Sequence, residues 1–152
     1  MSLKKTNTVL TAAFILFILW FGTEFILIPE TQAPGFGLPS WPSGDGGGFL
    51  IVKGIRDVVL ALVLAVLLVT GQRRALGWVL TVEALAAYGD MATVLAHHGS
   101  VATALGVHGL TATLMVVNGL LTLVETRRAG CSRRSPGQAS AEGLRAASEA
   151  RT

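Results

Sequence analysis

Two long apolar segments constrain this chain most, because a soluble protein surface cannot accommodate them. Residues 8–29 contain one charged side chain, Glu24, and residues 58–70 contain none. About 20 apolar residues, at a rise of about 1.5 Å each, span a hydrocarbon core of about 30 Å. Only 14% of the chain is charged, whereas soluble domains carry about 25%. The sequence therefore predicts an integral membrane protein.

We predict an all-α fold, an antiparallel four-helix membrane bundle within residues 1–125. Its spanning helices cover residues 8–28, 49–70, 76–96 and 101–125. Pro29 closes the first helix, and a glycine- and proline-rich outer loop follows over residues 30–48. The remaining residues 126–152 are rich in Arg, Ser, Ala and Gly, which predicts a disordered basic tail.

Basic residues outside the predicted spans gather on one side of the membrane. They are Lys4, Lys5, Arg73, Arg74, Arg127, Arg128, Arg133 and Arg134. The opposite loops, residues 30–48 and 97–100, contain no Lys or Arg. The positive-inside rule then predicts a multi-pass plasma-membrane protein with both termini and the tail in the cytoplasm. This topology accounts for the net charge of +3, so nucleic-acid binding is not indicated.

Six ionisable residues lie inside the apolar helices. They are Glu24, Lys53, Arg56, Asp57, Asp90 and His108. A charge at bilayer depth costs at least about 2.5–3.5 kcal/mol, so such residues face the interior and pair. From the rise per residue, most of them lie roughly 7–12 Å below the outer membrane edge. We therefore predict one polar layer to which every helix contributes.

This layer provides the candidate site. Lys53, Arg56 and Asp57 share one face of the second helix, at spacings of three and four residues. With Glu24 and Asp90, the layer holds two cations and three anions, so one negative charge is uncompensated unless His108 is protonated or a carboxyl is neutral. Acid/base candidates are Asp90 and His108. Arg56 and Lys53 would bind an oxygen or anion, with Asp57 and Glu24 orienting them. A purely structural ion-pair network is the alternative.

Three further side chains complete the predicted site. Trp20 lies one turn below Glu24 on the first helix, and Glu83 shares a face with Asp90. Glu83 and Asn118 are each roughly 10 Å from the cytoplasmic edge. They form a second, thinner polar layer in which Asn118 can hydrogen-bond a protonated Glu83. An ordinary interhelical hydrogen bond is the favoured interpretation. In the functional alternative, Glu83 extends the polar pocket or serves as a proton relay.

The sequence has no recognisable cofactor or metal motif. It lacks GxGxxG, P-loop, GxSxG, CxxC and HExxH patterns. His97 and His98 are adjacent, but no cysteine or carboxylate lies at metal-ligand spacing from them. The single cysteine, Cys131, excludes an intrachain disulfide. We therefore expect neither a cofactor nor a metal.

Three segments resemble a known family. They are VKGIRDVVLALVLAVLLVTGQRRALGW, YGDMATVLAHHG and GVHGLTA. They are similar to a family of small four-helix membrane proteins of bacteria and filamentous fungi that is filed as a domain of unknown function. The chain also resembles, more loosely, the DoxX-like membrane proteins. The resemblance implies the fold and a membrane location, and it brings no settled substrate or reaction.

The leading functional hypothesis is a small membrane enzyme that acts on a lipophilic molecule. Isomerisation or cyclisation fits best, because these reactions need only proton transfers. One alternative is a non-catalytic, DoxX-like accessory or scaffold subunit, and a less favoured one is a small carrier. A homo-oligomer and a complex with a partner membrane protein both stay open.

Overall fold

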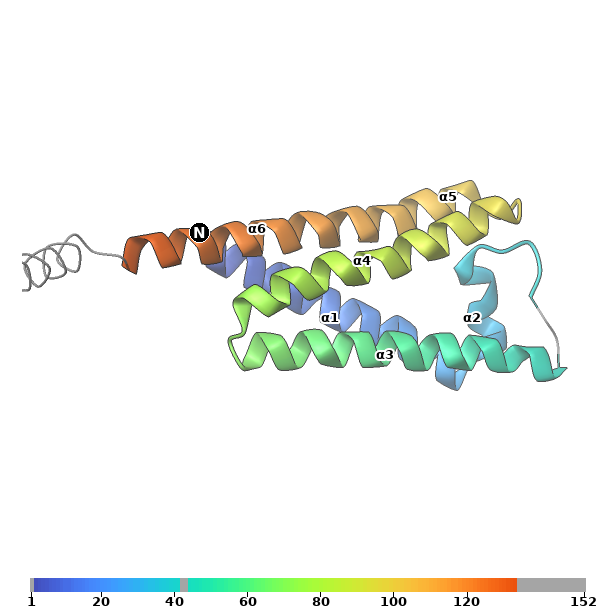
Figure 1. Cartoon of the computed structure of the whole chain (residues 1–152). Coiled ribbons are helices and arrows are strands. Elements are labelled where there is room, and N and C mark those ends of the chain that lie inside the picture. Colours follow the sequence, from blue (N-terminus) through green and yellow to red (C-terminus); the bar gives the residue numbers. More distant parts are fainter. Residues whose placement is uncertain (1, 42–43, 134–152) are drawn as a thin grey trace, which may run out of the picture.

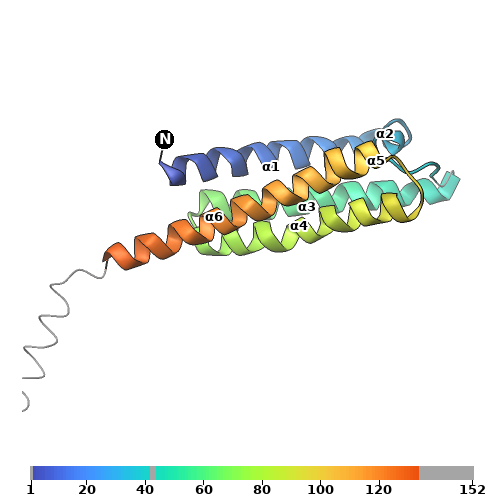
Figure 2. The ribbon, with the colours of Figure 1, turned by 90° about the horizontal axis from the view of Figure 1, so that it is seen from above.

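The computed structural model describes residues 2–41 and 44–133, and the described part of the chain is helical without any strand. Four long helices, α1, α3, α4 and α6, lie side by side (Figures 1 and 2). The start of α1 and the end of α6 lie at the same end of the molecule, and the short helix α2 lies at the other end. The all-helical part of the fold prediction is thus confirmed.

Helix α1 covers Leu3–Leu27 and begins earlier than predicted. Ser2 explains the earlier start, because its side chain accepts a hydrogen bond from the backbone N–H of Lys5, at 3.5 Å, and caps the helix. Ile28 ends α1 at φ −136° and ψ 53°. Pro29 enforces this ending, because a proline disfavours the α conformation in the residue before it.

The prediction of an irregular loop over residues 30–48 is wrong in part. Helix α2 covers Pro29–Phe36, and a 3₁₀ turn, η1, covers Gly44–Gly47. Pro29 occupies the first helical position, where its missing N–H costs no hydrogen bond and its φ is already helical. Gly37 ends α2 at φ 97°, in the left-handed region that glycine adopts without strain.

Helix α3 covers Gly48–Val69 and α4 covers Arg73–Ala96. The last helical stretch runs without a break through α5 (Val101–Thr103), the π-helical segment η2 (Ala104–Gly109) and α6 (Leu110–Arg133). Residues 126–133 are therefore helical, which corrects the predicted start of the disordered tail. Arg127, Arg128 and Ala129 in this stretch favour a helix, and basic side chains suit its C-terminal end. The rest of the predicted tail, residues 134–152, lies outside the described residues.

Within the described residues, three helices are long and apolar enough to cross a membrane. They are Leu3–Leu27, Arg73–Ala96 and Val101–Gly130. Helix α3 is 22 residues long, but its first half carries Lys53, Arg56 and Asp57. The outer surface is rich in exposed large apolar side chains, such as Leu16, Leu85 and Val69. These features indicate a membrane protein, because a soluble monomer rarely exposes so much contiguous apolar surface.

The long helices pack as two close pairs, α1 with α3 and α4 with α6. Small residues allow each close approach. A Cβ atom on Gly54 would lie 2.5 Å from the carbonyl oxygen of Gly22, and one on Gly119 would lie 2.5 Å from Thr81 Oγ1. A core cluster that includes Leu64, Leu76, Leu80, Ala112 and Met115 joins the pairs. The cluster fixes the spacing of the helices around the site described next.

Gly54→Val is expected to destabilise the protein, because the new side chain would meet the α1 backbone and Phe25. Overpacking of this kind typically costs about 1–3 kcal/mol. The measurement is the midpoint of thermal unfolding in detergent. Gly89→Ala is the control, since nothing lies within 4 Å of its Cβ position on α4 and the added methyl favours a helix. Equal midpoints for the two variants would contradict the close packing of α1 on α3.

Candidate functional site

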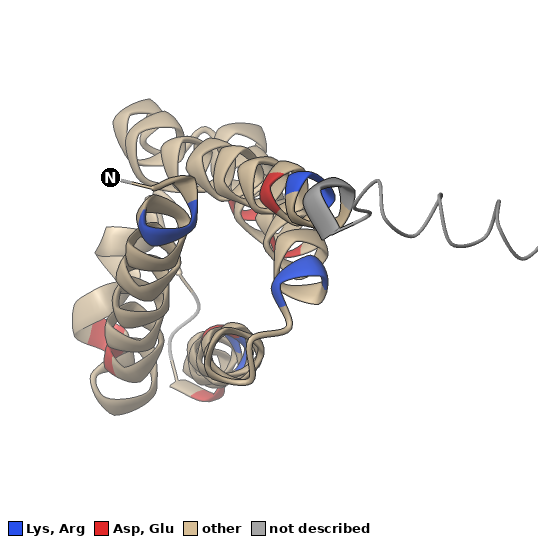
Figure 3. Cartoon of the chain, turned by 90° about the vertical axis from the view of Figure 1, so that its left-hand side faces the viewer, with Lys and Arg blue, Asp and Glu red and all other residues tan. Residues whose placement is uncertain are grey.

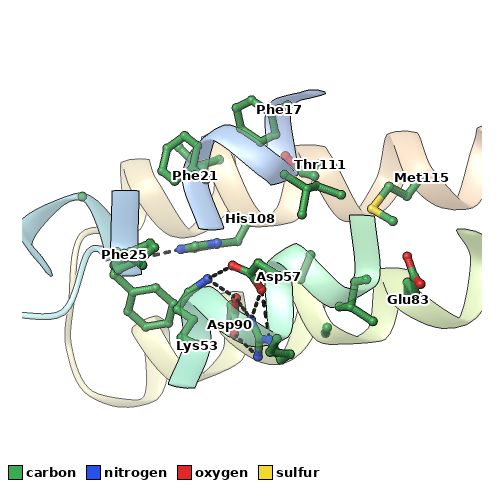
Figure 4. A pocket seen from close by; sticks show the side chains of 18 residues that line it. Phe17, Phe21, Phe25, Lys53, Asp57, Glu83, Asp90, His108, Thr111 and Met115 are labelled. Atoms are coloured by element: carbon green, nitrogen blue, oxygen red, sulfur yellow. Dashed lines mark hydrogen bonds and ion pairs between the residues drawn. The ribbon is translucent and has the colours of Figure 1, made fainter. Parts of the chain in front are cut away.

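A cavity of about 90 Å³ lies among the long helices, and eighteen residues line it. Helices α1, α2, α3, α4 and α6 and the π-helical segment η2 all contribute to its wall. Figure 4 shows charged side chains gathered toward one end, with Glu83 at the other. The middle is apolar and is formed by Phe17, Phe21, Leu60 and Met115 among others.

Four charged residues form a closed cluster at one end, which we call the ion cluster. It consists of Lys53, Arg56, Asp57 and Asp90. Lys53 Nζ lies 2.6 Å from Asp57 Oδ2 and 3.5 Å from Asp90 Oδ2. Arg56 Nη2 lies 2.9 Å from Asp57 Oδ1 and 3.0 Å from Asp90 Oδ2. Each carboxylate therefore contacts both cations, and the cluster ties α3 to α4.

Burial makes this pairing necessary. The side chains of Lys53, Asp57 and Asp90 are 16%, 12% and 15% exposed. Arg56 is 41% exposed and closes the cluster on its outer side. A charge removed from water needs a close partner and further hydrogen bonds to offset its lost hydration. Two cations and two carboxylates meet this need and leave a net charge of zero.

The structure corrects the predicted charge imbalance, because Glu24 is not part of the ion cluster. The carboxylate of Glu24 accepts a hydrogen bond from the side-chain amide of Gln32 on α2, and Glu24 does not line the cavity. The cluster is thus neutral without a protonated His108. Trp20 also lies outside the cavity wall. It is 56% exposed, and its ring and that of Phe21 are 5.1 Å apart in a T-shaped arrangement.

Two aromatic rings complete the environment of Lys53. Its ammonium nitrogen lies 4.8 Å from the ring centroid of Phe25 and 5.4 Å from that of Phe36. Cation–π contacts at such distances contribute about 0.5–2 kcal/mol, and more when water is excluded. Phe25 is 1% exposed, so its ring covers one side of the Lys53 ammonium group and shields it from solvent. Sequence reasoning missed both rings, and the only available signal was the position of Phe25 one turn beyond Phe21.

His108 enters the cavity from the π-helical segment η2. Its Nε2 lies 2.9 Å from the backbone oxygen of Phe36, and the two rings are 5.1 Å apart. A carbonyl oxygen only accepts hydrogen bonds, so Nε2 carries the proton and donates it. In the neutral ring Nδ1 is then the acceptor. One-turn π-helical insertions are rare and often occur at functional sites.

Glu83 and Asn118 do not form the hydrogen bond that the sequence predicted between them. Glu83 lines the cavity, and its Oε2 is buried without a hydrogen-bond partner among the described residues. Asn118 is 1% exposed and donates from Nδ2 to Thr11 Oγ1, at 2.9 Å. The expected hydrogen bond between Asn118 and Glu83 is therefore replaced by one between α6 and α1, and Asn118 does not line the cavity.

A second polar network lies at the opposite end of the molecule and was not predicted. Arg73 Nη2 lies 2.8 Å from Glu125 Oε2, and Asn7 Nδ2 donates to the same oxygen at 3.1 Å. Arg73 Nη1 also donates to Thr8 Oγ1, at 3.1 Å. This network joins α1, α4 and α6. Among the described residues, no group of three or more His, Cys, Asp or Glu side chains is placed to hold a metal ion.

Among the described residues, the fold and site define an all-helical protein with helices long and apolar enough to cross a membrane and with a half-open cavity that is charged at one end. The chain belongs to the family described as Domain of unknown function (DUF4267), whose model matches residues 15–122. This match confirms the family resemblance predicted from the sequence, and the similarity to DoxX-like proteins stays a prediction. Searches of the curated proteins and of the solved structures return no match. The matched range contains the ion cluster, His108 and Glu83.

Proposed function

We propose that α1, α3, α4 and the helix from α5 to α6 form an antiparallel four-helix bundle in the plasma membrane, with both termini cytoplasmic. Three observations support this arrangement. The charged side chains of α3 belong to the ion cluster, where they pair with one another and with Asp90 on α4. The remaining surface of α3 is apolar and exposed, for example at Val59, Leu62 and Val66. The basic residues at the end of the molecule where α1 starts and α6 ends also follow the positive-inside rule (Figure 3).

Cysteine labelling is expected to reveal this orientation. In a Cys131→Ser background, a membrane-impermeant maleimide should label Ser40→Cys in intact cells and Gln72→Cys only after the membrane is disrupted. Both positions are exposed and lie in connections at opposite ends of α3. Labelling of Gln72→Cys in intact cells would reverse or remove the proposed topology. Labelling of both variants in disrupted membranes controls for reagent access.

We further propose that the cavity binds a lipophilic small molecule that enters laterally from the bilayer. The observation that carries this proposal is the contrast within one cavity, apolar along most of its wall and charged at one end. Ligand sites are typically mostly apolar with a few convergent polar groups. The apolar part would hold a hydrocarbon portion, and the ion cluster would hold a polar end.

The proposed reaction is an isomerisation or cyclisation by proton transfer. His108 is the best-placed base, because its Nε2–H is held by the Phe36 carbonyl and its Nδ1 is left as an acceptor. The proton taken from one atom of the substrate would return to another, so no net proton is consumed. Lys53 and Arg56 would stabilise a developing negative charge on a substrate oxygen. Asp57 and Asp90 would hold both cations in place, with Asp90 the other acid/base candidate.

Ala87→Phe is expected to abolish ligand retention, because its side chain would project into the cavity. The test compares lipophilic compounds extracted from purified wild-type and variant protein by mass spectrometry. Ala92→Phe makes the same change on the exposed surface of α4 and should retain the wild-type compounds. A retained compound should be converted by wild-type protein and not by His108→Ala. Identical extracts from the wild-type protein, Ala87→Phe and Ala92→Phe would contradict a binding cavity.

A non-catalytic membrane subunit is the second candidate, and the closed ion cluster favours it. All four charges are paired within the protein, which is what a packing element requires. This candidate would be supported by stable co-purification with another membrane protein, together with normal function of His108→Ala.

A further inference from the structure

One polar atom in the cavity wall lacks a partner within the described protein. Glu83 Oε2 is buried and receives no hydrogen bond, although the opposite end of the same cavity pairs all its charges. Leaving a buried polar group unpaired costs about 1–3 kcal/mol. Native proteins pair most buried polar groups, so such an exception needs an explanation. A ligand group that completes the bond would provide one.

The position of Glu83 sets the distance to the ion cluster. Glu83 and Asp90 are seven residues apart on α4, which places them on one face, two turns and about 10 Å apart. Both line the cavity, and Ala86 and Ala87 lie between them. Phe21, Leu60 and Met115 border the same stretch from the other helices. The cavity is therefore polar at both ends and apolar between them (Figure 4).

The ion cluster still offers a donor to a ligand. An ammonium group carries three N–H donors. Lys53 donates one of them to Asp57 and lies 3.5 Å from Asp90 Oδ2 in an ion pair. A donor therefore remains for an oxygen of a bound molecule. At the other end, a hydroxyl suits Glu83 best, since a hydroxyl donates to a carboxylate and accepts from a carboxylic acid.

We propose that the ligand is polar at both ends, with an oxygen at the ion cluster and a hydroxyl about 10 Å away that bonds Glu83. This inference rests on the proposed function, since it names the chemical class of the molecule that the cavity holds. A ligand with two polar ends differs from simple fatty acids and alcohols, which have a polar group at one end only. Glu83 acts here as a specificity-determining residue.

The test uses two probes that differ only in the second end. Octanediol carries a hydroxyl at each terminus, and octanol carries one. Their affinities are measured from the rise in the unfolding midpoint with ligand concentration in detergent. Glu83→Leu should reduce the advantage of octanediol over octanol by about 3- to 10-fold, which is the effect of one hydrogen bond. Glu83→Gln should retain most of the advantage, because an amide can still donate and accept.

Controls separate this inference from the proposed function. Glu30→Leu removes an exposed carboxylate from α2 and should leave the ratio of affinities unchanged. If Ala87→Phe blocks both probes while Glu83→Leu leaves their ratio unchanged, the cavity binds lipophilic molecules and the inference about Glu83 is wrong. If neither probe binds the wild-type protein, the proposed function fails as well.

A chain-length comparison does not depend on any variant. Butanediol is too short to reach from the ion cluster to Glu83, so its second hydroxyl should bring no gain over butanol. The gain of octanediol over octanol should therefore exceed that of butanediol over butanol. Equal gains for the long and short pairs would overturn the proposal.

Discussion

Asp57→Asn is expected to lower the free energy of unfolding by about 3–5 kcal/mol, because it leaves an uncompensated charge in the ion cluster. Asp57 is bonded to both Lys53 and Arg56, at 2.6 Å and 2.9 Å. Asparagine keeps the shape but replaces one of the two acceptor oxygens with an NH2 donor, so the change removes both the charge and the acceptor of Lys53 or Arg56. The measurement is an unfolding titration in detergent.

The matched control is Asp45→Asn, which makes the same substitution at an exposed position of η1. It should change the free energy of unfolding by no more than about 0.5 kcal/mol. Replacing Asp57 by Leu together with Lys53 by Met should recover most of the loss, because the cluster is again neutral and the new side chains are apolar. A loss in the double variant as large as in Asp57→Asn would contradict the charge argument.

The same experiment bears on function. If the ion cluster only holds α3 against α4, the neutral double variant should keep every property of the wild-type protein. If Lys53 binds an oxygen of a ligand, the double variant should fold and yet lose the ligand. Stability and ligand retention thus separate the two candidate functions at one position.

The sequence predicted the ion cluster because helical spacing is a strong constraint. Lys53, Arg56 and Asp57 share a face at spacings of three and four residues, and the cost of lipid exposure requires that face to point inward. Asp90 lies at a similar depth on another helix. Depth and face together leave few ways to pair these charges, and the structure brings them within 4 Å.

Depth alone did not place Glu24. Adjacent residues on a helix point about 100° apart, since one turn takes about 3.6 residues. Phe25 points inward and is 1% exposed, so Glu24 is rotated away from the cavity. It meets Gln32 instead, on a helix that the glycine- and proline-rich composition concealed. The charge imbalance predicted around His108 disappears with this rotation.

The π-helical segment had no sequence signal either. Its backbone hydrogen bonds join residues five apart, whereas those of an α-helix join residues four apart. Nothing in the sequence of residues 104–109 favours the longer spacing. Tertiary contacts accompany it: His108 bonds the Phe36 carbonyl, and a Cβ on Gly109 would lie 2.9 Å from Met91 Sδ. The partner of His108 comes from α2, which was itself predicted as a loop. An error in one element therefore concealed the geometry of another.

Glu125→Leu is expected to have the second-largest effect on stability, a loss of about 3–5 kcal/mol. The change removes the partner of Arg73, whose side chain is 13% exposed, and it also frees the buried amide of Asn7. Arg73 is the first residue of α4, where the positive end of the helix dipole disfavours a cation. Without Glu125, that unfavourable interaction is no longer offset.

Arg74→Leu provides the matched control for this effect. Arg74 follows Arg73 in the same first turn and is exposed, so its loss should leave stability unchanged or raise it by about 0.3–1 kcal/mol. The double variant Arg73→Leu with Glu125→Leu should recover much of the loss seen for Glu125→Leu alone, because no unpaired charge remains. Additive losses in the double variant would show that the two side chains act independently. The Arg73–Glu125 ion pair would then contribute nothing of its own to the junction of α1, α4 and α6.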